Sequence, residues 1–143
     1  VVRTGAVWGE KAEGMKLVKE IASISNEKKS YRTVHYISGI CSAFYMKEAM
    51  DLAMQSGNFS GEAIRDAMYV KENWVPKGLE GICLPSSWKE DDHRGLMEIP
   101  IYRVKVNGST EKKKVDELMK KGVIELIKED QIKLPRRPEW RGY

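Results

Sequence analysis

Two cysteines and two histidines are the side chains in this 143-residue sequence best suited to nucleophilic or metal chemistry. A nucleophilic Ser or Cys needs a base within hydrogen-bonding reach, and His35 and His93 are the histidines available for that role. His35 precedes Cys41 by six residues, a spacing that does not place two side chains on one helical face. Cys41 and Cys83 lie far apart and indicate neither a disulfide framework nor a metal-ligand cluster. We therefore interpret both cysteines as small buried hydrophobic residues, leave the redox compartment open, and expect no catalysis and no cofactor.

The densest polar cluster is the segment Asp91-Asp92-His93-Arg94-Gly95. Carboxylates and imidazole are suitable metal ligands, but consecutive residues rarely converge on one ion. We favour a hydrogen-bonded turn between strands, in which Gly95 adopts a backbone conformation that is costly for other residues. The sequence has no phosphate-binding loop of the G-x-x-x-x-G-K-[ST] or G-x-G-x-x-G kind, so nothing in it supports nucleotide binding.

Composition and charge are those of one packed globular domain, with 41% hydrophobic and 32% charged residues. The longest apolar stretch, residues 34–46, is interrupted by polar side chains, and we expect no membrane span. The net charge of +4 comes from the C-terminal part of the chain. Residues 103–143 contain 12 basic and 7 acidic side chains, whereas residues 1–102 contain 13 basic and 14 acidic ones. This mixed-sign tail lacks the one-signed field of a nucleic-acid-binding protein, so we expect no nucleic-acid partner.

The first half of the chain has three helical patterns that would position these side chains. Apolar residues recur at three- and four-residue spacing over 12–22, which predicts an amphipathic helix. From about Thr33 to Ser56 they occupy most of the helical circumference, which predicts a helix with neighbours on nearly every side and a more deeply buried first half. Gly57 is a typical helix stop, and Ser60 is a typical cap for a short third helix.

Strands are predicted mainly around and after these helices, at residues 1–7, 82–84 and 99–106. A turn at Asn107-Gly108 comes next, and then a helix over 111–121. Residues 123–127 fit a strand or a helix equally well. Two prolines within 135–140 predict an extended tail. The fold class is therefore α/β.

The order of several short segments is similar to that of a known protein family. The segments are Tyr36-Ile37-Ser38-Gly39, Gly78-Leu79-Glu80-Gly81-Ile82, Asp92-His93-Arg94-Gly95, Ile101-Tyr102-Arg103-Val104 and the closing Leu134-Pro135-Arg136-Arg137-Pro138-Glu139-Trp140-Arg141-Gly142-Tyr143. In this order they resemble the C-terminal third of the periplasmic branched-chain amino acid binding proteins of ABC transporters. The likeness covers about residues 1–106 and the tail.

The resemblance implies a partial type I periplasmic-binding-protein-like lobe, with three to four helices and a small sheet. Family members are clamshells of two α/β lobes that hold an amino acid or small carboxylate between them. Residues 1–84 would then end the first lobe, 85–97 would form a hinge-like crossing, and 98–143 would add strands, a helix and a tail to the second lobe. Trp88, His93 and Arg94 would belong to the hinge.

The resemblance also implies a ligand contact at the start of the buried helix, from Tyr36, Gly39 and Ile40. The family often has an aromatic residue directly after the glycine, whereas here Ile40 follows Gly39. This aliphatic residue puts the usual ligand in doubt, and packing of the helix start is the alternative role for all three residues. Because one lobe wall cannot enclose a ligand, we expect residues 1–143 alone to bind it weakly or not at all.

By this resemblance the chain is a non-catalytic solute-binding component of an importer. Its partners would be a small amino acid or carboxylate and a membrane permease, and an exposed inter-lobe surface could pair two copies. Its location would be periplasmic, or extracytoplasmic and lipid-anchored in Gram-positive bacteria, with any signal peptide preceding Val1. The alternatives are a stand-alone interaction module whose basic C-terminal tail contacts an acidic partner, and an enzyme using Cys41 or His93.

Overall fold

The computed structural model describes residues 5–25, 31–111 and 113–135, and in this part the chain is a mixed α/β structure. The helices are α1 (Met15–Ile24), α2 (Val34–Gln55), α3 (Gly61–Tyr69) and α4 (Val115–Lys120). The strands are β1 (Ser87–Lys89), β2 (Asp92–Gly95), β3 (Glu98–Val106) and β4 (Ile124–Lys133). They form two antiparallel sheets of two strands each, β1 with β2 and β3 with β4, where a single small sheet was predicted.

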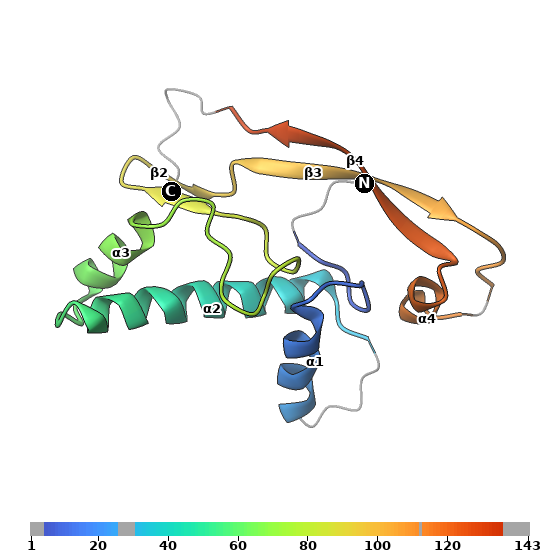
Figure 1. Ribbon diagram of the computed structural model, residues 1–143, viewed down its shortest axis with the longest axis horizontal. Helices are drawn as coiled ribbons and strands as arrows, with labels where there is room; N and C mark the ends of the chain where they lie inside the picture. The colour runs from blue at the N-terminus through green and yellow to red at the C-terminus, as the bar shows by residue number, and fades with distance from the viewer. Residues whose placement is uncertain (1–4, 26–30, 112, 136–143) are drawn as a thin grey trace.

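The helix α2 is the long axis of the structure (Figure 1). The helix α1 lies near its first turns, α3 lies near its last turns, and the segment between α3 and β1 loops back over its middle (Figure 1). The β3–β4 ribbon runs along the opposite side of the molecule, with α4 near its far end (Figure 1). The core lies between α1, α2 and residues 74–83, and its fully buried side chains include Val18, Ile37, Leu79 and Ile82.

The predicted stop at Gly57 and cap at Ser60 are confirmed, and the structure adds a cap at Thr33. The Thr33 hydroxyl accepts a hydrogen bond from the Tyr36 N–H (3.4 Å), and the Ser60 hydroxyl accepts one from the Ala63 N–H (3.2 Å). Gly57 has a φ of +78°, which is the left-handed conformation expected after α2. These contacts satisfy backbone groups that a helix end leaves unpaired.

The helix α1 begins later than its apolar pattern, because the backbone before it contacts another segment. The Gly14 N–H donates to the Glu80 carbonyl (3.1 Å), and a Cβ on Gly14 would lie 2.7 Å from the Leu79 Cα. A glycine is therefore required where α1 and residues 78–82 approach each other.

The prediction that α2 has neighbours on nearly every side is wrong for the described structure. Its buried residues occupy more than half of the helical circumference but leave the face with Met46 and Met54 uncovered, and they are spread along the helix rather than gathered in its first half: Ile37, Ile40, Tyr45, Ala49 and Ala53. Met46 is 49% exposed and Met54 is 61% exposed. The helix is apolar around its circumference, but the described elements cover only part of it.

The strand predicted at 82–84 is also wrong, since these residues belong to none of the strands and the first two lie in turns. The Ile82 and Cys83 N–H groups both donate to the Leu79 carbonyl, at 3.0 and 3.1 Å. Positive φ angles at Gly78 and Gly81 turn the chain at this point. Residues 5–7 form no strand, although the Ala6 N–H donates to the Ile82 carbonyl (3.1 Å), and residues 1–4 lie outside the described part.

The second half of the chain contains a long antiparallel ribbon. The strand predicted at 99–106 is confirmed as β3. Residues 124–127 of the ambiguous segment belong to β4, which pairs with β3 along its length. The helix predicted over 111–121 is reduced to the six residues of α4. Of the predicted tail at 135–140, residues 136–140 lie outside the described part. The division at residues 84 and 97 remains a prediction, with the β1–β2 hairpin inside the middle segment.

Candidate functional site

A cavity of about 240 Å³ lies between the first half of α2 and the segment that leads into the β1–β2 hairpin. It is lined by Gly5, Ile37, Ser38, Cys41, Ser42, Tyr45, Cys83, Leu84, Ser86, Trp88 and Leu96. None of these described lining residues is charged, so the cavity combines aliphatic and aromatic walls with serine hydroxyls. Such a lining suits a small apolar group with limited hydrogen-bonding capacity.

One wall of the cavity is part of an aromatic cluster. The Tyr45 and Trp88 ring centroids are 5.0 Å apart, and Trp74 packs edge-to-face against both, at 5.2 Å from Tyr45 and 6.0 Å from Trp88. The Tyr45 hydroxyl lies 2.9 Å from the Trp74 carbonyl oxygen and 2.7 Å from that of Leu84. Burial raises the pKa of Tyr45, and the nearby Glu48 charge acts in the same direction. Tyr45 is therefore a neutral hydrogen-bond donor that ties α2 to the segment across from it.

A disulfide between Cys41 and Cys83 forms another part of the lining, with the two Cα atoms 5.7 Å apart. The interpretation of both cysteines as free buried thiols is therefore wrong. The helical position of Cys41 and the turns at 79–83 bring together two residues that are 42 apart in sequence. The bond covalently links α2 to the opposite wall of the cavity, and it leaves neither cysteine available as a nucleophile.

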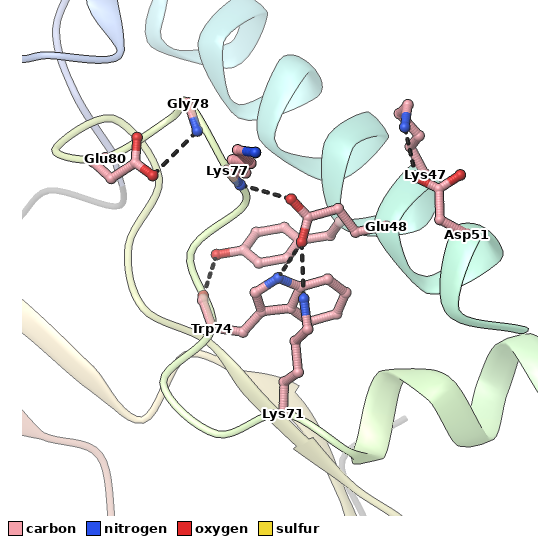
Figure 2. A network of polar contacts seen from close by, with 9 residues as sticks. Lys47, Glu48, Asp51, Lys71, Trp74, Lys77, Gly78 and Glu80 are labelled. Atoms are coloured by element: carbon pink, nitrogen blue, oxygen red, sulfur yellow. Dashed lines mark hydrogen bonds and ion pairs between the residues drawn. The ribbon is translucent and has the colours of Figure 1, made fainter. Parts of the chain in front are cut away.

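The Glu48 carboxylate makes a second connection between α2 and residues 71–77 (Figure 2). Its Oε1 accepts a hydrogen bond from the Lys77 backbone N–H (2.6 Å). Its Oε2 accepts from the Trp74 indole N–H (2.8 Å) and from the Lys71 ammonium (3.0 Å). The Lys71 Nζ also lies 4.5 Å from the Trp74 ring centroid, within range of a cation–π interaction. The network fixes the Trp74 ring that supports Tyr45 and Trp88.

These contacts lower the pKa of Glu48. Burial acts to raise the pKa, but the hydrogen bonds from the Lys77 N–H, Lys71 and Trp74 stabilise the ionised form and outweigh that effect. The carboxylate is therefore ionised at neutral pH, and its function here is structural: it holds the segment behind the cavity.

The structure brings other residues of α2 to the cavity than the ones predicted for a ligand. Tyr36, Gly39 and Ile40 do not line it: Gly39 is exposed, Ile40 is buried in the core, and Tyr36 packs under the Arg32 guanidinium at 5.3 Å. The residues that line it from α2 are Ile37, Ser38, Cys41, Ser42 and Tyr45. Their spacing of three and four residues marks one helical face, but the sequence does not say which face meets the cavity.

The three residues predicted for the hinge all lie in the β1–β2 hairpin. Trp88 lines the cavity and belongs to the aromatic cluster. The His93 Nε2 lies 2.8 Å from the Tyr69 hydroxyl at the end of α3. Arg94 donates to both carboxylate oxygens of the buried Asp92, at 2.8 and 2.6 Å.

Arg94 also connects the hairpin to the ribbon, because its Nη1 lies 3.3 Å from the carbonyl oxygens of Leu134 and Pro135. The expected special conformation of Gly95 is confirmed by its φ of +74°. The segment 92–95 is a strand, however, rather than the turn predicted for it.

The described residues contain neither a metal-binding cluster nor a membrane-spanning helix. Within residues 5–25, 31–111 and 113–135, no group of three His, Cys, Asp or Glu side chains is close enough to hold a metal ion. In the same residues, no helix combines the length and the apolar character needed to cross a bilayer.

Comparison of the chain with protein-family models, with curated proteins and with solved structures finds no match. A function for this chain therefore has to be argued from the cavity, its lining residues and the contacts that hold its walls together.

Proposed function

We propose that this chain is the C-terminal part of a non-catalytic solute-binding component of an ABC importer, for branched-chain amino acids or related small carboxylates. The observation that supports this proposal is the uncharged cavity of about 240 Å³ between α2 and the β1–β2 hairpin. It lies beside the hairpin that contains Trp88, His93 and Arg94, the residues assigned to the hinge by resemblance.

The cavity fits the aliphatic part of such a solute. Ile37, Leu84 and Leu96 supply apolar surface, and the hydroxyls of Ser38 and Ser42 supply limited polar contact. An ammonium or carboxylate group buried there would be left without an ionic partner, which is strongly unfavourable. The charged end of the solute must therefore be bound by groups outside this cavity, as in a site closed by two lobes.

The disulfide supports an extracytoplasmic location for this activity. Disulfides persist in oxidising compartments such as the periplasm and are rare in the reducing cytosol. The Cys41–Cys83 bond lies in the wall of the proposed site, so the compartment that keeps it oxidised also keeps the site in shape. A membrane permease would be the partner that receives the solute.

The test is a calorimetric titration of the protein encoded by the complete gene, with leucine, isoleucine, valine, aspartate and small carboxylates. We expect saturable binding of at least one aliphatic member of the panel. Ser42→Trp would fill the cavity and abolish the heat of binding, because Ser42 is an exposed lining residue. The same change at Ser23, on the exposed surface of α1, is the control and should leave binding intact. A folded protein that binds none of the panel, or whose Ser42→Trp variant binds normally, would overturn the proposal.

Two other observations distinguish the importer proposal from the alternative function, an interaction module with a basic C-terminal tail. A gene that encodes two preceding α/β units and an export signal supports the importer proposal. Binding of the chain to anionic vesicles or nucleic acid, lost at raised salt, would instead favour the module.

A further inference from the structure

The side of α2 that faces away from the core carries an uninterrupted row of small and apolar residues. We call Gly39, Ala43, Met46, Met50 and Met54 the α2 stripe; they succeed one another at steps of four, three, four and four residues. This spacing keeps all five on one helical face. Gly39 and Ala43 are exposed, Met46 and Met54 are 49% and 61% exposed, and Met50 is half-buried. Among the helices and strands of the described residues, none is drawn below the middle of α2 in Figure 1.

The α2 stripe contains no charged residue, which is unusual for the solvent-facing side of a surface helix. The charged pair beside it, Lys47 and Asp51, is already bonded within the helix, with 2.6 Å between Nζ and Oδ2. Contiguous apolar surface of this kind is characteristic of an interaction site.

The sizes of the side chains make the α2 stripe complementary to itself in one orientation. Its first half contains Gly39 and Ala43, and its second half contains three methionines. Space is open beside the first half, because a Cβ on Gly39 would have nothing within 4 Å. Two antiparallel copies place Met54 over Gly39, Met50 over Ala43, and Met46 near Met46 of the other copy. Large side chains then fill the space above small ones over the whole length, whereas a parallel pair would set methionine against methionine.

We infer that a second copy of this chain docks on the α2 stripe, with the two α2 helices antiparallel across a two-fold axis near Met46. A two-fold contact uses the same surface on both copies, which is what a self-complementary stripe provides. The 22 residues of α2 extend about 33 Å, and a contact about 10 Å wide buries roughly 330 Å² per copy. This is well below the roughly 800 Å² per partner of a stable complex, so the pair is a weak and transient dimer.

The first experiment measures the mass of the chain by analytical ultracentrifugation from micromolar to millimolar concentration. The wild-type mass should rise with concentration toward twice the 16.4 kDa of one chain. Met46→Glu places a charge at the two-fold axis and should weaken the dimer at least about tenfold. The control is Val70→Glu, the same type of change at a residue 74% exposed at the end of α3, and it should dimerise as the wild type does. Circular dichroism checks that both variants are folded.

The second experiment tests the orientation by cross-linking under mild oxidation. Met46→Cys should form a covalent dimer, because residue 46 meets its own copy, and Gly39→Cys should not, because residue 39 faces residue 54. A wild-type chain that stays monomeric throughout, or a dimer that Met46→Glu leaves unchanged, would overturn the inference. Efficient cross-linking of Gly39→Cys would overturn the antiparallel arrangement.

Discussion

Glu48 shows how a single side chain can hold distant segments together. It lies on α2, yet its carboxylate accepts hydrogen bonds from Lys71, Trp74 and Lys77, which are 23 to 29 residues further along the chain. Loss of the carboxylate would leave the indole N–H and a backbone N–H without their acceptor. Unsatisfied donors of this kind cost about 1–3 kcal/mol each when they are buried.

We expect Glu48→Gln to lower the free energy of unfolding at pH 7 by about 1–3 kcal/mol, because hydrogen bonds to a charged acceptor are lost. Folding lowers the pKa of Glu48 from its ordinary 4.5. The stability that this carboxylate contributes is therefore fully present above that value, and it is lost as the pH falls below it and through the lowered pKa of the folded protein. The variant should lack this part of the acid dependence. Urea unfolding at pH 7 and at pH 3 to 5 measures both effects.

The matched control is Asp51→Asn, which removes a carboxylate of the exposed Lys47–Asp51 pair on the same helix. Its effect should stay below about 1 kcal/mol, since exposed ion pairs contribute little. Equal effects of the two variants would contradict the structural function of Glu48.

The structure also explains why residue 95 is a glycine. Its φ is +74°, and a Cβ there would lie 2.8 Å from atoms of the Trp88 ring. Gly95→Ala should lower the free energy of unfolding by about 2–4 kcal/mol, from backbone strain together with displacement of the ring. Gly39→Ala is the control, because it is helical and meets open space, and it should be neutral or stabilising. Thermal unfolding of dilute protein compares them, and similar melting temperatures for the two variants would show that Gly95 is not constrained.

At the scale of elements, the disulfide holds α2 against the turns at 79–83. Closing a loop of this length restricts the unfolded chain and contributes about 4 kcal/mol in the chain-entropy description. Replacing both Cys41 and Cys83 with Ser should therefore lower the free energy of unfolding by about 2–4 kcal/mol. Urea unfolding with and without a reductant measures this loss. The reductant should move the wild type to the variant's midpoint and leave the variant unchanged, and equal midpoints without reductant would contradict the prediction.

At the scale of the whole molecule, the two halves differ in how they are supported. In the described residues, α2 packs against α3 and the core, whereas β3 and β4 pair only with each other. An isolated two-stranded ribbon is only marginally stable, because each strand has one unpaired edge. At the end of β4, the Arg94 contacts to Leu134 and Pro135 anchor the ribbon to the hairpin. At its other end, where β4 begins, the ribbon is preceded by the short helix α4.

Hydrogen exchange measured by mass spectrometry should reveal this difference. Amides of α2 around Tyr45 and Ala49 should exchange slowly, since these residues are buried in the core. The register of the β3–β4 pair shifts between Ile101 and Tyr102. Amides of β3 after this shift, and those of the β4 residues paired with them, should exchange much faster. Uniform protection over both regions would show that the ribbon is stabilised by contacts other than those described.

Features that depend on neighbours within a few residues could be predicted from the sequence. The cap at Ser60, the stop at Gly57 and the strand β3 result from local hydrogen bonding, backbone preference and alternation. For the same reason, the apolar circumference of α2 could be read from the sequence, although the described elements cover only part of it.

The candidate site could not be predicted in this way, because it depends on where distant segments meet. The disulfide joins two cysteines that are 42 residues apart, and the Tyr45 hydroxyl bonds to a carbonyl group 39 residues away. The face of α2 that lines the cavity is not the face that bears Gly39. Residues 124–127 form a strand because β3 supplies a partner for their backbone groups. Local patterns specify helices and turns through short-range free energies, whereas the face that lines a cavity and the cysteines that pair are fixed by the path of the folded chain.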